Sequence, residues 1–216
     1  MHSISACIFD LDGVIVDTAK YHFLAWKRLA NEWGFDFTER NNEQLKGVSR
    51  MRSLEILLEI GGVHLDDEAK QVAAARKNKW YVEYISKMDE SELLPGAKSL
   101  LQEVRQSGLK TALGSASKNA ALILERTHIT EYFDVIVDGT KTSKAKPDPE
   151  VFLLCASELR IPSEECIVLE DAQSGIEAAI RAGMRAVGIG APEILGKANL
   201  VVPSLTDISV QRLLTV

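Results

Sequence analysis

The sequence predicts an α/β protein, in which a doubly wound parallel sheet forms a Rossmann-like core that carries an inserted helical cap domain. Two observations lead to this prediction. Short apolar runs alternate with helical patterns in the second half of the chain, which is typical of parallel βαβ units. The first run ends near Asp10 and the next begins near Lys110, whereas a crossover between parallel strands needs only ~30 residues.

Six short runs are predicted as strands, because near-continuous apolar sequence is typical of strands buried on both faces of a sheet. They are Ile4–Phe9, Lys110–Gly114, Val135–Val137, Cys166–Leu169, Ala186–Ile189 and Leu200–Val202. Helical patterns lie between the later runs, and right-handed crossovers join strands of this kind. The predicted helices are Gly96–Ser107, Asn119–His128, Glu150–Arg160 and Gly175–Gly183.

The long interval after the first strand is predicted to hold a helical cap. His22 and Trp26 share one helical face, and Lys77 and Tyr81 share another. We therefore expect a core of residues 1–15 and 91–216 and a cap of residues 16–90. The active site is expected between them, at the carboxyl ends of the core strands.

Composition excludes several classes of partner. Asp and Glu (31) outnumber Lys and Arg (25), a net charge of −6, so we expect neither a nucleic-acid nor an anionic membrane surface. The start of the chain lacks the pattern of a signal peptide, and no run matches a membrane-spanning helix. Cys7, Cys155 and Cys166 are interpreted as buried residues of a reducing cytoplasm. A monomer is the default expectation.

Asp10 and Asp12 follow the first predicted strand and point to one side, since side chains alternate along an extended chain. Two neighbouring carboxylates repel each other and need a cation or a shared proton. Mg²⁺ suits them because it prefers oxygen ligands. A lone pair of this kind is better explained as two solvated turn residues before Gly13, so the assignment depends on what else meets there.

Three further polar clusters accompany the predicted strands. Glu170 and Asp171 follow the fourth predicted strand. Ser115 follows the second and opens a helix, where a hydroxyl and free backbone N–H groups form an anion site. Lys146 lies in the loop before the third predicted helix; an ordinary polar loop is the alternative. Each signal is weak alone, but together they indicate one site.

In order, these clusters resemble the four motifs of the haloacid dehalogenase superfamily of phosphotransferases: Asp10-Leu11-Asp12-Gly13-Val14, Ser115, Lys146-Pro147 and Glu170-Asp171. The resemblance implies that Asp10 is the nucleophile, forming an aspartyl-phosphate, and that Asp12 is the general acid/base. It implies that Ser115 and Lys146 hold the transferring phosphoryl group. The implied cofactor is one Mg²⁺ per chain, held by Asp10, Asp12, Glu170 and Asp171.

Longer segments are similar to the β-phosphoglucomutase family within that superfamily, namely residues 17–26, 44–50, 76–78, 114–119 and 188–193. This similarity covers nearly the whole chain. Met51-Arg52 and Trp80 depart from the family pattern without removing a residue with an implied role. The implied substrate-binding residues are Thr18, His22, Trp26, Lys46, Gly47, Arg50, Ser53, Lys77, Ala116, Ser117 and Asn119.

Arg50 is the candidate for binding a second phosphate, because a guanidinium suits bidentate contact with that group. Without the resemblance, Arg50 would be interpreted as a surface cation opening a helix. A solvated helix lysine explains Lys77 about as well as the substrate-binding role that the resemblance implies. A lone histidine such as His22 is more often a packing residue than a catalyst. Trp26 and Trp33 are expected in the core of the cap.

The resemblance implies a Mg²⁺-dependent β-phosphoglucomutase that interconverts β-D-glucose 1-phosphate and D-glucose 6-phosphate. The reaction would pass through phospho-Asp10 and a priming intermediate, β-glucose 1,6-bisphosphate. A sugar-phosphate phosphatase with the same core is the nearest alternative, with water attacking the aspartyl-phosphate. A phospho-accepting signalling domain is a more distant alternative, since such a module has no use for so large a helical insert.

Overall fold

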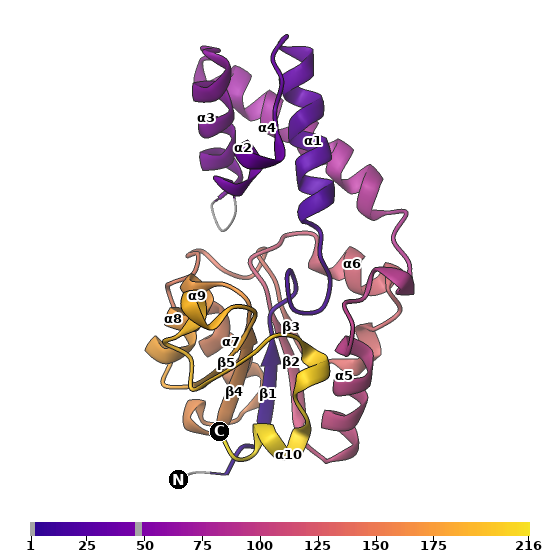
Figure 1. The fold of residues 1–216 in the computed structure, drawn as a ribbon, viewed down its shortest axis with the longest axis vertical. Coiled ribbons are helices and arrows are strands. Elements are labelled where there is room, and N and C mark those ends of the chain that lie inside the picture. The colour runs from indigo at the N-terminus through magenta and orange to yellow at the C-terminus, as the bar shows by residue number, and fades with distance from the viewer. Residues whose placement is uncertain (1–2, 46–48) are drawn as a thin grey trace. The chain divides into compact units, whose positions relative to one another are not determined.

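The computed structural model describes residues 3–45 and 49–216 and divides into two compact units. Unit 1 is Met1–Asp17 with Met88–Val216, and unit 2 is Thr18–Lys87 (Figure 1). The predicted roles of these units, a catalytic core and a cap, stay proposals. No helix among the described residues is long and apolar enough to cross a membrane.

Unit 1 is built on a six-stranded parallel sheet in the order β3-β2-β1-β4-β5-β6. The central strand β1 pairs with β2 on one side and β4 on the other, with Ala6 opposite both Lys110 and Cys166. The chain therefore reverses its direction of travel across the sheet at β1. The strands are β1 (Ala6–Phe9), β2 (Lys110–Gly114), β3 (Val135–Val137), β4 (Cys166–Glu170), β5 (Arg185–Ile189) and β6 (Leu200–Val202).

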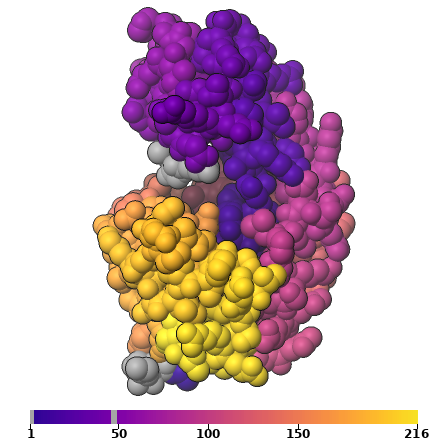
Figure 2. All heavy atoms as spheres, in the orientation of Figure 1, coloured from indigo at the N-terminus to yellow at the C-terminus, as the bar shows by residue number. Residues whose placement is uncertain are grey.

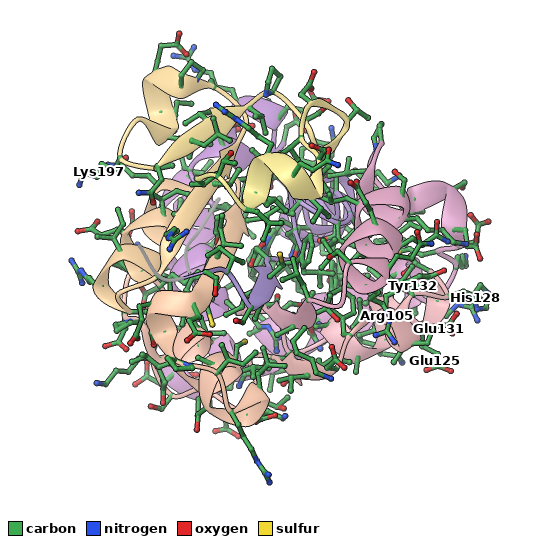
Figure 3. All side chains as sticks on the ribbon, turned by 90° about the horizontal axis from the view of Figure 1, so that it is seen from below. Arg105, Glu125, His128, Glu131, Tyr132 and Lys197 are labelled. Atoms are coloured by element: carbon green, nitrogen blue, oxygen red, sulfur yellow. The ribbon has the colours of Figure 1, made fainter. Side chains whose placement is uncertain are left out.

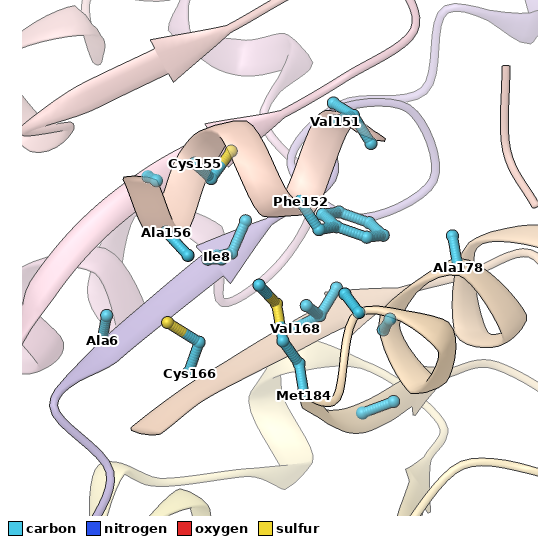
Figure 4. Packing of buried hydrophobic residues seen from close by; sticks show 14 of the residues in the cluster. Ala6, Ile8, Val151, Phe152, Cys155, Ala156, Cys166, Val168, Ala178 and Met184 are labelled. Atoms are coloured by element: carbon cyan, nitrogen blue, oxygen red, sulfur yellow. The ribbon is translucent and has the colours of Figure 1, made fainter. Parts of the chain in front are cut away.

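One face of the sheet is covered by α7 (Glu150–Leu159) and α8 (Gln173–Arg181). Ile8 and Val168 project from the strands into this layer and are fully buried with Phe152 of α7 (Figure 4). Cys155 and Cys166 lie in the same layer, whereas Cys7 alternates to the other face, and all three thiols are buried and unpaired.

Other helices of unit 1 lie around β2 and near the chain's end. The helix α5 (Ala97–Gln106) packs on β2 through Leu100, Leu101 and Val104. Arg105 of α5 donates to the carbonyl oxygen of Tyr132 at 3.2 Å (Figure 3). The C-terminal residues form part of the surface of unit 1 (Figure 2). The remaining helices are α6 (Ala120–Arg126), α9 (Pro192–Leu195) and α10 (Val210–Leu213), with short 3₁₀ turns at Glu90–Glu92, Thr130–Tyr132, Ser163–Glu165 and Leu205–Asp207.

The two segments of unit 1 that lead to and from unit 2 are joined to each other. Val16 forms an isolated antiparallel bridge with Leu93. The backbone N–H of Leu94 donates to the carbonyl oxygen of Ile15 at 2.9 Å. The insertion therefore leaves and re-enters unit 1 at a single point.

Unit 2 is a helical bundle of α1 (Ala19–Glu32), α2 (Glu39–Glu43), α3 (Arg50–Gly61) and α4 (Asp67–Ile85). The long helices α1, α3 and α4 pack against one another, and Trp26, Leu57 and Tyr81 are buried between them. Trp33, expected in this core, is half-buried where α1 ends. Asp66 begins α4 by accepting a hydrogen bond from the backbone N–H of Ala69 at 2.8 Å, as an N-cap residue does.

The predicted fold class is confirmed. Every strand expected from the apolar runs is present, and the four predicted helices of the core appear with ends shifted by at most two residues. The short helix α2 is not predicted by apolar periodicity, because its sequence has no apolar face; it begins with Thr38 and Asn41 capping each other.

Ile8→Ala is expected to lower the free energy of unfolding by ~2–5 kcal/mol, since Ile8 is fully buried in the central strand and the lost side chain leaves a cavity. Urea unfolding followed by circular dichroism measures this change. Leu153→Ala on α7, where the side chain is 42% exposed, serves as the control and should cost at most ~0.5 kcal/mol. Equal losses in the two variants would contradict the assigned core.

Candidate active site

The candidate site of unit 1 lies at the carboxyl ends of three neighbouring strands. Asp10 directly follows β1, Glu170 ends β4, and Ser115 directly follows β2. Parallel strands bring these ends to the same edge of the sheet, at the point where the strand order changes at β1. The sheet itself thus assembles three of the sequence-predicted site residues.

Lys146 joins two of those strands from the loop before α7. Its Nζ lies 2.5 Å from Oδ1 of Asp10 and 2.6 Å from Oε1 of Glu170, and it donates to the carbonyl oxygen of Gly114 at 3.2 Å. The side chains of Lys146 and Asp10 are each only 10% exposed. Beneath the ammonium, the ring of Phe152 lies with its centroid 4.8 Å from Nζ.

The charges in this cluster do not balance. Burial raises the pKa of Asp10 well above its usual value; Lys146 opposes the rise, and Glu170 adds to it. Burial alone would lower the pKa of Lys146, but the charges of Asp10 and Glu170 outweigh it and raise that pKa. Lys146 therefore stays an ammonium, one positive charge among several carboxylates.

Asp171 brings a third carboxylate to the cluster. Ligand oxygens of Asp10, Glu170 and Asp171 lie within 4.8 Å of one another. Burial, followed by the charge of Glu170, raises the pKa of Asp171 to about 7. Gly13 adopts φ +81°, and a Cβ there would lie 1.9 Å from Oδ2 of Asp171, so this turn admits only glycine beside the carboxylate.

The three carboxylates fit a divalent cation. They supply hard oxygen ligands, which Mg²⁺ prefers, and one ammonium leaves negative charge to be neutralised. Asp12 is partly buried, and its charge acts on Asp171, but its carboxylate lies outside this group of three. A magnesium role for Asp12 through its side chain stays a prediction.

The loop after β2 holds Ser115 in a defined orientation. Ser115 is 2% exposed, and its N–H donates to the carbonyl oxygen of Val137 at 3.0 Å. Its Oγ accepts the N–H of Ser117 at 3.0 Å, so the hydroxyl proton is free to point elsewhere. Asn119 follows, and its N–H donates to Oγ of Ser117 at 3.3 Å, while Ala116 is exposed.

Unit 2 contains a second polar cluster, centred on Lys77. This side chain is 2% exposed, and its Nζ lies 2.7 Å from Nδ1 of His22. The rings of Trp26 and Tyr81 lie with their centroids 4.5 and 5.0 Å from that Nζ. The His22 ring stacks on Tyr81 at 4.0 Å, and the hydroxyl of Tyr81 donates to Oγ1 of the fully buried Thr18 at 3.2 Å.

Arg50 and Ser53 lie on α3 of the same unit. Arg50 is exposed at the first position of α3, and Ser53 is 4% exposed. Arg50 makes no ion pair with any residue of the described part of the chain, whereas Arg52 pairs with Glu55 and Glu59 at 3.1 and 3.2 Å. The predictions for Lys46 and Gly47 lie outside the described residues.

The predicted site residues therefore form two groups, each within one unit. Asp10, Lys146, Glu170 and Asp171 meet in unit 1, and Thr18, His22, Trp26 and Lys77 meet in unit 2. Two contributors were not among the predicted site residues: Phe152 beside Lys146, and Tyr81 beside His22 and Thr18. Tyr81 shares a helical face with Lys77, a signal that pointed to it; for Phe152 the sequence carries no such signal.

Comparison with known proteins gives a consistent result. Residues 4–183 match the family model described as haloacid dehalogenase-like hydrolase. The β-phosphoglucomutase of Bacillus subtilis is 44% identical over 97% of this chain and 94% of its own. The phosphorylated carbohydrates phosphatase of Thermotoga maritima is 34% identical over 85% of this chain and 84% of its own. A crystal structure of β-phosphoglucomutase from Clostridium difficile superposes with a TM-score of 0.89 at 44% identity, covering 97% of this chain and 95% of that one.

Stability should depend on pH through Lys77. Burial, with a further contribution from Arg50, lowers the pKa of Lys77 to about 7, compared with ~10.4 for an unfolded lysine. Between these values the unfolded state binds more protons, so the free energy of unfolding should rise with pH from about 7 upward. We expect this rise between about pH 7 and pH 9 in urea unfolding of the wild type, and little of it in Lys77→Met.

Lys79→Met, on the exposed side of the same helix, is the control for the removal of a lysine. It should keep the pH profile of the wild type. A profile of Lys77→Met parallel to that of the wild type would show that Lys77 does not titrate in this window.

Proposed function

Since the chain belongs to the haloacid dehalogenase-like hydrolase family, we propose that it is a phosphotransferase acting as a β-phosphoglucomutase. It would interconvert β-D-glucose 1-phosphate and D-glucose 6-phosphate, and β-glucose 1,6-bisphosphate would be both intermediate and primer. The sugar assignment is supported by the relatives with 44% identity over nearly the full chain. We also propose that the enzyme works as a monomer in the cytoplasm.

The contact of Lys146 with Asp10 and Glu170 carries the phosphoryl-transfer part of the proposal. Asp10 is the nucleophile: its carboxylate oxygen attacks phosphorus, and the bond from phosphorus to the sugar oxygen breaks. Lys146 opposes the rise that burial causes in the pKa of Asp10, and it lies where it would neutralise the phosphoryl oxygens. The Oγ of Ser115 already accepts a hydrogen bond from the N–H of Ser117, so its hydroxyl donates a hydrogen bond to one of those oxygens.

The proposed cofactor is one Mg²⁺, held by Asp10, Glu170 and Asp171. The ligand set predicted from the sequence also includes Asp12. When bound, it would neutralise the negative charge shared by these carboxylates and the phosphoryl group.

Asp12 is proposed as the general acid/base. It donates a proton to the departing sugar oxygen, and in the second half of the reaction its carboxylate takes the proton of the attacking sugar hydroxyl. Asp12 follows Asp10 by two residues beyond β1, and its charge acts on Asp171 of the same cluster.

Unit 2 is proposed to bind the rest of the substrate. Arg50 would bind the phosphate that is not being transferred, because its guanidinium has no carboxylate partner among the described residues. Thr18, His22, Trp26, Ser53 and Lys77 would contact the sugar bisphosphate, with Ala116, Ser117 and Asn119 contributing from unit 1. The proposal includes Lys46 and Gly47 on the strength of the sequence alone.

One experiment tests the whole proposal. The protein is incubated with Mg²⁺, β-glucose 1-phosphate and a trace of β-glucose 1,6-bisphosphate, and glucose 6-phosphate and free phosphate are followed together. We expect glucose 6-phosphate to form in large excess over phosphate, and activity to vanish with Asp10→Asn or excess chelator. Free phosphate as the main product would establish a phosphatase instead, the alternative favoured by the 34% identical Thermotoga maritima relative.

Asp12→Asn is expected to slow transfer from the sugar phosphate far more than phosphorylation of Asp10 by acetyl phosphate. A sugar alkoxide needs a general acid to leave, an effect of ~10²–10⁴-fold, whereas acetate leaves without one. Rapid-quench measurement of phospho-Asp10 with both donors gives the comparison. Equal losses with the two donors would limit Asp12 to a ligand or structural role.

Arg50→Ala is expected to reduce mutase activity by ~10²-fold, which corresponds to losing a charge-assisted phosphate contact of about 3 kcal/mol. Phosphorylation of Asp10 by acetyl phosphate should persist, because that donor has no second phosphate. Arg52→Ala is the matched control: it lies two residues along the same helix but pairs with Glu55 and Glu59.

Three outcomes are informative. Loss of mutase activity in Arg50→Ala alone supports the proposed phosphate contact. Loss of both activities would make Arg50 structural. Full activity of the variant would favour the phosphatase, which needs no contact for a second phosphate.

A further inference from the structure

The turn after β3 contacts the loop after β2 beyond the last paired residues of the two strands. Within the sheet, Gly114 is the last residue of β2 to pair, opposite Val137. Beyond that point the N–H of Gly139 donates to the carbonyl oxygen of Ser117 at 3.1 Å. Gly139 thus contacts the loop that holds Ser115, although it belongs to a different connection of the chain.

Position 139 needs a glycine because another backbone segment lies so close to it, and not because of its φ angle. A Cβ at this position would lie 2.2 Å from the carbonyl oxygen of Ala116 and 2.9 Å from its carbonyl carbon. Real Cβ atoms do not come this close to backbone, so any larger residue must displace the Ala116 carbonyl. The φ angle of Gly139 lies outside the left-handed region, so an alanine there carries no backbone strain of its own.

The turn that carries Gly139 is braced by Asp138. This carboxylate is 9% exposed, and its Oδ1 accepts the N–H of Thr140 at 2.9 Å and the Thr140 hydroxyl at 2.5 Å. The carbonyl oxygen of Asp138 accepts the N–H of Lys141 at 3.0 Å. These bonds fix the direction of the Gly139 N–H toward Ser117.

The orientation of one peptide unit transmits this contact to Ser115. The carbonyl of Ala116 and the N–H of Ser117 belong to the same planar peptide and point in opposite directions. Gly139 packs against the carbonyl side, and the N–H side donates to Oγ of Ser115 at 3.0 Å. Because Oγ accepts this bond, its own proton is left to donate to a ligand.

We propose that Gly139 is a positioning residue, which acts through the Ala116–Ser117 peptide to keep the Ser115 hydroxyl a donor to the transferring phosphoryl group. The assignment of that ligand rests on the proposed function. The orientation of the Ala116–Ser117 peptide does not depend on the proposed function, and a separate experiment measures it.

The test compares Gly139→Ala with Gly196→Ala, a glycine at which φ is −60° and an added Cβ comes no closer than 3.1 Å to other atoms. Amide hydrogen exchange of Ser117 in the free protein reports the bond to Ser115. We expect it to accelerate at least ~10-fold in Gly139→Ala and to stay unchanged in Gly196→Ala. Unchanged exchange in Gly139→Ala would overturn the proposal, whatever reaction the protein catalyses.

Kinetics then link the peptide to Ser115. Gly139→Ala should lower kcat by at least ~10-fold with little change in KM, as expected when a donor to the transferred group is misplaced. In a Ser115→Ala background the same substitution should cost less than ~2-fold further, since both act on one interaction. Losses that multiply in the double variant would overturn the proposal.

A second pair of variants covers the case in which Gly139→Ala does not fold. Asp138→Asn keeps an oxygen that accepts from Thr140, whereas Asp138→Ala removes it. Ser117 exchange should accelerate in Asp138→Ala and match the wild type in Asp138→Asn. Equal exchange of Ser117 in both Asp138 variants would overturn the proposal. If the exchange rates are as expected but the wild-type protein is inactive as a mutase, only the proposed function is contradicted.

Discussion

Two buried carboxylates facing one buried ammonium form the constraint on which unit 1 depends. Asp10 follows β1 and Glu170 ends the adjacent strand β4, and their mutual repulsion is offset by Lys146, which reaches both at hydrogen-bond distance from a separate loop. Removing one partner of such a group leaves an uncompensated buried charge, which costs far more than the pair contributes. The chain therefore has to bring β1, β4 and the loop before α7 together, and this requirement positions the Asp10 carboxylate.

Much of the fold follows from local sequence. Parallel strands buried on both faces leave continuous apolar runs, and all six strands appear where such runs occur. Departures occur where a tertiary contact or a local helix cap decides the structure instead of the apolar pattern. The strand β4 extends one residue beyond its apolar run because Glu170, a charged residue, is paired with Lys146 and with the N–H of Ala172. The helix α2 exists through mutual capping by Thr38 and Asn41, which apolar periodicity does not detect.

The candidate site divides in the same way. The order of the acidic, hydroxyl and lysine motifs predicted that Asp10, Lys146, Glu170 and Asp171 would meet, and these four residues do lie together. Their catalytic roles stay predictions. Contacts that depend on packing could not be predicted from the sequence. Residues 22 and 77 lie 55 positions apart, yet His22 and Lys77 share a hydrogen bond. The ring beneath Lys146 comes from Phe152, whose sequence context is that of an ordinary core residue.

The bridge between Val16 and Leu93 has a consequence for how the chain folds. The central strand β1 must find β2, and Ala6 and Lys110 are 110 − 6 = 104 positions apart. Closing so long a loop is entropically unfavourable when the intervening chain is flexible. If the helices of unit 2 form first, the entry and exit segments come close together, and the bridge at Val16 completes the closure. The insertion then behaves as a short connection, so β1 and β2 can pair at a rate set by a small effective contact order.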